Sequence, residues 1–145
     1  MVICASDPVL DLAALLGGDP DEGGSWSAPS GAFTGDLDPA THESGDYVYT
    51  VAGNTYCPDS SAVFQITINQ RPDAGTPGQV VVCDTLPAFP LFPVLNGTPD
   101  GGGTWLDLST SGGLSGGNLN TTGLAPGDYD FQYTVQVPGC AAASS

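Results

Sequence analysis

The amino-acid sequence contains one pattern of landmarks twice, and this duplication constrains the fold more than any other feature. The matched landmarks are Cys4 and Cys83, Trp26 and Trp105, Tyr47 and Tyr129, and Cys57 and Cys140. They recur in one order at offsets of 79 to 83 positions, too long for a short solenoid repeat but suited to a small domain in tandem. The sequence therefore predicts repeat 1 over residues 1–71, a linker over 72–78 and repeat 2 over 79–145.

The composition favours short strands joined by tight turns. There are 21 Gly and 13 Pro among 145 residues, which makes long helices unfavourable. The clearest strand is 62–69, where Phe64, Ile66 and Ile68 alternate with polar residues. Six or seven such strands in each repeat predict an all-β fold of two β-sandwiches. The Trp and Tyr landmarks are its expected core residues.

Comparison of the two copies settles two further segments. The leucines of 10–16 are spaced as in a short amphipathic helix, but proline at every third position of the matching segment 87–95 forbids a regular helix there. We therefore expect an extended segment or a single helical turn in both copies. No counterpart of strand 62–69 follows Cys140, so repeat 2 is predicted to lack its final strand and to leave an open edge. We expect the natural chain to continue, or a neighbouring molecule to supply this strand.

Each repeat carries two cysteines, and the duplication favours a disulfide within each repeat. The predicted pairs are Cys4 with Cys57 and Cys83 with Cys140, out of three connectivities that four cysteines allow. Each bond would contribute about 4 kcal/mol in the chain-entropy model. Disulfides indicate an oxidising compartment, so we expect an extracellular or cell-surface location. The alternative is four buried free thiols in a cytosolic protein.

The charge balance excludes several classes of partner. Sixteen acidic residues stand against the single base Arg71, and the formal net charge is −15. Nucleic-acid binding needs a basic surface, and anionic membrane surfaces would repel this chain. The most apolar stretch, 9–16, is too short to insert into a membrane. The first residues lack the basic lead of a signal peptide, so we expect a segment of a longer exported protein.

Calcium binding is the first chemical candidate. Asp19, Asp21 and Glu22 form a dense acidic turn, and calcium takes six to eight oxygen ligands. Repeat 2 keeps only Asp100 at this turn, and a solvated acidic turn before the Trp strand is the simpler interpretation. No other cofactor is expected.

Catalysis is not expected, because the residues that it needs are missing. His42 is the only histidine, so no His-based triad or multi-His metal site can form within one chain. Carboxylate pairs are unavoidable with so many acids, and their proximity would mean little. Exposed aromatic residues could instead form a sugar-stacking platform; Tyr56, Phe92 and Tyr129 are candidates, with burial in the core as the alternative.

The pattern as a whole resembles a known repeat type. A Leu-rich stretch follows the first cysteine, then Asp-Pro-Asp-Glu-Gly-Gly-Ser-Trp at 19–26, Gly-Asp-Tyr-Val-Tyr-Thr-Val at 45–51 and Cys-Pro-Asp-Ser at 57–60. This is similar to the Ig-like tandem repeats of very large surface adhesins and gliding-associated proteins of Bacteroidota, typically exported by the type IX system. The resemblance runs from Val2 to Cys140 and includes no catalytic signature.

The resemblance implies two tandem Ig-like β-sandwich domains in a structural or adhesive spacer of a long extracellular or cell-surface fibre. It implies no particular ligand. Expected partners are neighbouring copies of the repeat, joined by strand addition at the open edge of repeat 2, and surface glycans. The alternative function is a calcium- or glycan-binding module of a secreted protein. The departures from the pattern are Asn96 in place of Gly17, the insertion Asp130–Phe131 and the missing final strand.

Overall fold

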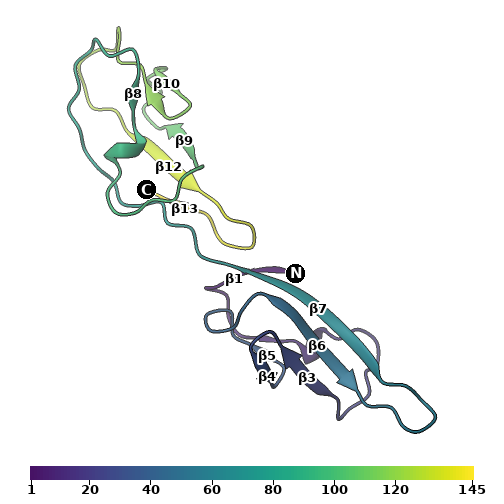
Figure 1. Ribbon diagram of the computed structural model, residues 1–145. Helices are drawn as coiled ribbons and strands as arrows, with labels where there is room; N and C mark the ends of the chain where they lie inside the picture. Colours follow the sequence, from purple (N-terminus) through teal and green to yellow (C-terminus); the bar gives the residue numbers. More distant parts are fainter. The chain divides into compact units, whose positions relative to one another are not determined.

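The computed structural model describes residues 1–145 and is all-β, with several small and mostly antiparallel sheets (Figure 1). The chain divides into two compact units. Unit 1 comprises Met1–Arg71 and the turn Pro138–Cys140, and unit 2 comprises Pro72–Val137 and Ala141–Ser145. The structure has no helix with the length and apolarity needed to cross a membrane.

Unit 1 is built on a five-stranded sheet. Its strands, in spatial order, are β1 (Val2–Cys4), β7 (Ser60–Asn69), β6 (Gly45–Val51), β3 (Ser25–Ala28) and β4 (Gly31–Phe33). All neighbours are antiparallel except β1 and β7, and a small pair of β2 (Leu10–Asp11) and β5 (Asp36–Leu37) lies outside this sheet. The strand predicted over 62–69 is confirmed and begins two residues earlier.

The core of unit 1 comes from the apolar faces of these strands and from Leu12, which follows β2. Five buried residues form it, namely Ile3, Leu12, Leu37, Tyr47 and Ile66. Trp26, Phe33 and Phe64 are partly buried and pack against this core. Alternation along β7 explains the arrangement, because Phe64, Ile66 and Ile68 share one face of a pleated strand.

Unit 2 holds two three-stranded sheets. The first contains β10 (Leu114–Ser115), β11 (Asn118–Leu119) and β8 (Phe89–Pro90). The second contains β13 (Ala143–Ser144), β12 (Phe131–Val135) and β9 (Thr104–Asp107). Its main buried cluster is smaller, with Ala74, Tyr133 and Val135 packed by partly buried Trp105. Residues 72–78 belong to this unit, where Thr76 and Asn96 exchange both backbone hydrogen bonds.

The two copies repeat the same local structure at the Leu-rich segment 10–16 and its proline-rich counterpart 87–95. A single 3₁₀ turn occurs at Ala13–Leu15 in unit 1 and at Phe92–Val94 in unit 2, so the expectation of at most one helical turn is confirmed. In each copy the residue before the turn donates its backbone N–H to a glycine carbonyl, Leu12 to Gly35 at 2.9 Å and Leu91 to Gly117 at 3.0 Å.

The prediction that repeat 2 lacks its final strand is wrong, because the first residues of that strand are present as β13. β13 pairs with β12 in the register Thr134–Ser144 and Val135–Ala143. This is the register in which β6 pairs with the first residues of β7, Thr50 with Ser61 and Val51 with Ser60. Backbone hydrogen bonds between Tyr133 and Ser145 extend the ladder by one more pair, because the backbone groups of β12 need partners.

Both tyrosine landmarks are predicted to be core residues, but only one of them is fully buried. Tyr47 is fully buried, whereas its counterpart Tyr129 is only partly buried. Each hydroxyl donates to the carbonyl four residues earlier, Glu43 at 2.7 Å and Ala125 at 2.8 Å. Because Asp130 and Phe131 are inserted after Tyr129, strand β12 begins later and Tyr133 becomes the buried tyrosine of unit 2.

Candidate functional site

The cysteines pair differently from the prediction. Cys4 and Cys140 form a disulfide with a Cα–Cα distance of 4.8 Å, while Cys57 and Cys83 are unpaired and exposed. The predicted bonds Cys4–Cys57 and Cys83–Cys140 are therefore wrong. The reason lies in the sheet: Cys4 aligns with Asn69 at the end of β7, whereas Cys57 lies in the loop before β7. Ten strand residues separate those ends by about 30 Å, far beyond the reach of a disulfide.

The turn Pro138–Cys140 is fitted closely into unit 1. Cys4 is 1% exposed and Cys140 is 8% exposed. The side-chain amide of Asn69 donates to the carbonyl of Pro138 at 2.9 Å. Gly139 adopts a φ of +79°, and a Cβ atom there would lie 3.1 Å from the backbone of Ile3. The disulfide is thus buried among β1, the end of β7 and this turn.

A second repeated feature is a module of one Trp, one Tyr and one Gly. In unit 1 the rings of Trp26 and Tyr49 lie 5.0 Å apart at 46°, and the Tyr49 hydroxyl accepts a hydrogen bond from the backbone N–H of Gly24 at 2.9 Å. The same hydroxyl donates to the carbonyl of Asp21 at 2.8 Å. A Cβ atom on Gly24 would overlap the Tyr49 ring, so this position requires glycine.

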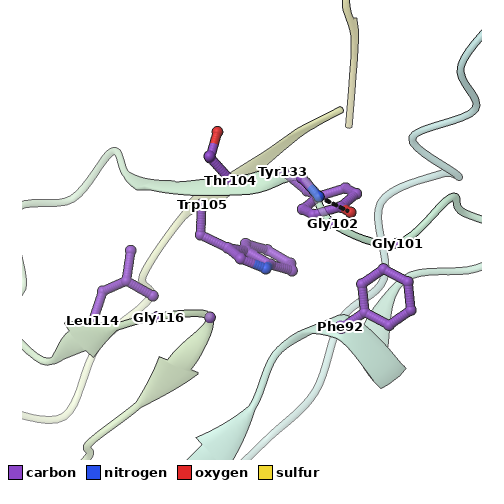
Figure 2. Close-up of a pocket in the computed structure, with 10 residues that line it drawn as sticks. Phe92, Gly101, Gly102, Thr104, Trp105, Leu114, Gly116 and Tyr133 are labelled. Carbon is purple, nitrogen blue, oxygen red and sulfur yellow. Dashed lines mark hydrogen bonds between the residues drawn. The ribbon is translucent and has the colours of Figure 1, made fainter. Parts of the chain in front are cut away.

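Unit 2 builds the module again with nearly the same geometry. The rings of Trp105 and Tyr133 lie 5.1 Å apart at 45°. The Tyr133 hydroxyl donates to the carbonyl of Asp100 at 2.6 Å and accepts from the backbone N–H of Gly103 at 2.8 Å, the dashed line in Figure 2. Sequence reasoning identified both tryptophans and missed Tyr49 and Tyr133 as their partners. The signal was present, because the two tyrosines stand within matching Tyr-Thr-Val segments.

The module of unit 2 lies beside a pocket of about 580 Å³. Its lining is aromatic, aliphatic and glycine-rich, and Figure 2 shows Trp105, Phe92 and Leu114 around the same space. The ring of Phe92 is 38% exposed and meets Tyr133 edge-on at 5.5 Å. Of the three aromatic residues predicted for a sugar platform, Phe92 lines this pocket and Tyr129 does not; Tyr56 lies in unit 1 and is 94% exposed.

The pocket exists because Trp105 has fewer aromatic neighbours than Trp26. Trp26 packs against three rings, those of Phe33, Tyr49 and Phe64. Trp105 packs against Tyr133 alone. Leu114 lies on β10 and lines the pocket with an aliphatic side chain, where Trp26 instead meets the ring of Phe33 on β4. The indole of Trp105 therefore borders open space.

The acidic residues do not assemble into a metal centre. Asp19, Asp21 and Glu22 are all exposed, and no group of three or more His, Cys, Asp or Glu side chains is placed to hold a metal ion. The predicted calcium site therefore has no preformed set of carboxylate ligands. His42 has a local role, since its Nδ1 accepts a hydrogen bond from the backbone N–H of Asp38 at 2.9 Å.

Two ionisable groups are perturbed by their surroundings. The pKa of Asp107 is lowered, chiefly by the hydrogen bond that Ser111 Oγ donates to its carboxylate at 2.6 Å. The pKa of Tyr47 is raised above 10.0, first by burial and second by the negative charge of Glu43. Asp107 orders the turn after β9 through hydrogen bonds from Ser111 and Gly112, and Tyr47 belongs to the core of unit 1.

Comparison with known protein families, with curated proteins and with solved structures gives no match. The fold and the site together define an all-β protein that builds one Trp–Tyr–Gly module twice and buries one disulfide.

Proposed function

We propose that this chain is a non-catalytic structural or adhesive spacer from a long extracellular or cell-surface fibre. The observation that carries the proposal is the module built twice, with ring distances of 5.0 and 5.1 Å and matching hydrogen bonds. The two copies share the packing of this module and no functional side chain beyond it. Such a duplication lengthens a chain more directly than it adds a chemical activity. A buried disulfide suits an oxidising compartment, and strong negative charge keeps neighbouring modules soluble.

Location on the outside of the cell is the direct test of this proposal. An antibody raised against the 145-residue chain is applied to intact cells of the source organism, before and after treatment with an external protease. We expect labelling of projecting material on untreated cells and its loss after proteolysis, with a cytosolic protein as the unlabelled control. Labelling that requires permeabilised cells would contradict the proposal.

Strand addition is the proposed contact between neighbouring copies. In unit 1, β7 pairs with β6 along seven residue pairs, whereas β13 covers only the end of β12. Phe131 and Gln132 therefore leave one edge of β12 open. A strand with the alternation of β7, presenting residues like Phe64 and Ile66 inward, would extend this ladder and enlarge the small core of unit 2.

A peptide with the sequence of Ala62–Asn69 tests the open edge. We expect it to bind and to raise the melting temperature of unit 2, because ligands that bind only the folded state stabilise it. A control peptide carrying Phe64→Gln and Ile66→Gln keeps the backbone and removes the apolar face. Equal effects of both peptides would contradict strand addition at this edge.

Glycan binding in the pocket of unit 2 is the second candidate function. The favouring observation is the partly exposed Phe92 ring beside Trp105 in a space of about 580 Å³, since flat apolar rings stack on sugar faces. A glycan array with the intact chain provides the screen. Phe92→Ala should abolish any hit, whereas Leu108→Ala, which removes a more exposed apolar side chain outside the lining, should not.

A further inference from the structure

The two unpaired cysteines are repeat counterparts of the two that are bonded. Cys83 corresponds to Cys4, and Cys57 corresponds to Cys140. The bond Cys4–Cys140 therefore joins the first cysteine of repeat 1 to the second cysteine of repeat 2. Continued along a series, the same rule pairs Cys83 with the second cysteine of a following repeat. It likewise pairs Cys57 with the first cysteine of a preceding repeat.

We propose that Cys83 of one molecule forms a disulfide with Cys57 of the next, so that copies of this chain link head to tail. The inference rests on the proposed spacer function, because it makes a second copy of the chain the partner. Such a contact is heterologous: it joins two different surfaces and leaves one of each free at the ends. Its product is an open linear assembly, which is what a fibre requires.

Exposed apolar side chains beside each thiol support this pairing. Val81, two residues before Cys83, is 99% exposed, and Tyr56, immediately before Cys57, is 94% exposed. Val2, the counterpart of Val81, is 47% exposed because it lies on β1 and pairs with β7. A contact between the two cysteine segments would remove both Val81 and Tyr56 from water, and aromatic residues are enriched in such contacts.

The proposed contact around Cys57 cannot have the same backbone geometry as the turn Pro138–Cys140. Tyr56 stands where repeat 2 has Gly139, and a Cβ atom on Gly139 would lie 3.1 Å from the backbone of Ile3. The φ of +79° at Gly139 is also unfavourable for tyrosine. The segment around Cys57 must therefore approach less closely, with the Tyr56 ring turned toward Val81 while the sulfur pairing is kept.

The chemistry requires an oxidant, and a small-molecule disulfide such as oxidised glutathione supplies it. The thiolate of Cys57 attacks one sulfur of oxidised glutathione, which releases one glutathione thiolate and leaves a mixed disulfide. The Cys83 thiolate of a second molecule then attacks the Cys57 sulfur and releases the second glutathione. Two protein thiols become one disulfide, and one oxidised glutathione becomes two reduced molecules.

Two single variants of the intact chain separate specific linkage from random coupling. Cys57→Ser retains only the Cys83 thiol, and Cys83→Ser retains only the Cys57 thiol; both keep the Cys4–Cys140 bond. Each variant alone, and an equimolar mixture, is incubated with oxidised glutathione and analysed by non-reducing electrophoresis and mass mapping of the linked peptides. The unsubstituted chain is run beside them, with the double variant as the control that cannot couple.

We expect each variant alone to remain a monomer carrying glutathione, the mixture to form a Cys57–Cys83 dimer, and the unsubstituted chain to form a ladder. Random coupling would give as much mixed dimer as the two homodimers together. That result, or the absence of dimer in every sample, would overturn the inference. Surface labelling of cells would be unaffected by either outcome, so a failure here is distinguishable from a failure of the spacer function.

Discussion

Removing the Cys4–Cys140 disulfide should destabilise unit 1 by about 4 to 5 kcal/mol. The bond closes a loop with a sequence separation of 136, for which the chain-entropy model gives about 5 kcal/mol at 25 °C. If unit 2 stays folded while unit 1 unfolds, only about half of the loop is flexible. The contribution then falls to about 4 kcal/mol, because the dependence on loop length is logarithmic. Either value is a large share of the 5 to 15 kcal/mol that stabilises an ordinary domain.

The assay uses the distribution of tryptophans, one in each unit. In a Trp105→Phe background the fluorescence of Trp26 reports on unit 1 alone. Urea unfolding is compared for this background and for the same chain with Cys4→Ser and Cys140→Ser. The matched control is Cys57→Ser with Cys83→Ser, which also replaces two cysteines but at exposed, unpaired positions. The control should stay within about 0.5 kcal/mol of the background, as surface substitutions usually do.

Two results would refute the reasoning. If the control loses as much stability as the Cys4 and Cys140 variant, the assigned pairing is wrong. If neither loses stability, the disulfide does not constrain the unfolded chain as the entropy model assumes. Reduction of the background chain should reproduce the Cys4 and Cys140 variant, which separates loss of the bond from any effect of the serine side chains.

Three further predictions concern the tyrosine and glycine positions. Gly103→Ala should cost about 1 to 3 kcal/mol in urea unfolding of unit 2, since the new Cβ would overlap the Tyr133 ring, whereas Gly101→Ala should be nearly neutral because nothing lies within 4 Å of its Cβ position. Tyr133→Phe should cost about 1 to 3 kcal/mol by removing one donor and leaving a backbone N–H unpaired, and Tyr56→Phe, at an exposed ring without that role, should change nothing measurable. The raised pKa of Tyr47 means that the folded state favours the neutral phenol. This part of the stability is present below pH 10.0 and is lost as the pH rises through the folded pKa. The free energy of unfolding should therefore fall less steeply with rising alkaline pH in Tyr47→Phe.

Local structure was predictable from the sequence wherever the pattern was itself local. The alternation in 62–69 predicted β7, and the proline spacing of 87–95 predicted the single turn of both copies. These features depend on neighbours along the chain. Tyr47 was predictable as a core residue from the repeated Gly-Asp-Tyr landmark and the β-branched and aromatic residues that follow it, and it is fully buried.

Pairing between distant segments was not predictable in the same way. The parallel addition of β1 to the far end of β7 places Cys4 beside Asn69, and no local pattern encodes that choice. The insertion of Asp130 and Phe131 had a comparable effect, because it moved the start of β12 past Tyr129 and brought Tyr133 into the core. The pocket beside Trp105 depends on which rings are missing around it, and only the assembled strands determine this.

The boundaries of the sequence repeats differ from the boundaries of the compact units in the structure. Sequence comparison divides the chain at residues 72–78, yet unit 1 includes the turn Pro138–Cys140, which belongs to repeat 2 by every landmark. The buried cysteine of unit 1 is thus completed by a residue from the following repeat. If each module in a series buries its first cysteine against the next one, the remaining cysteines must pair with those of other repeats. In this chain the two exposed thiols are Cys57 and Cys83, which are the two that the rule assigns to a preceding and a following repeat.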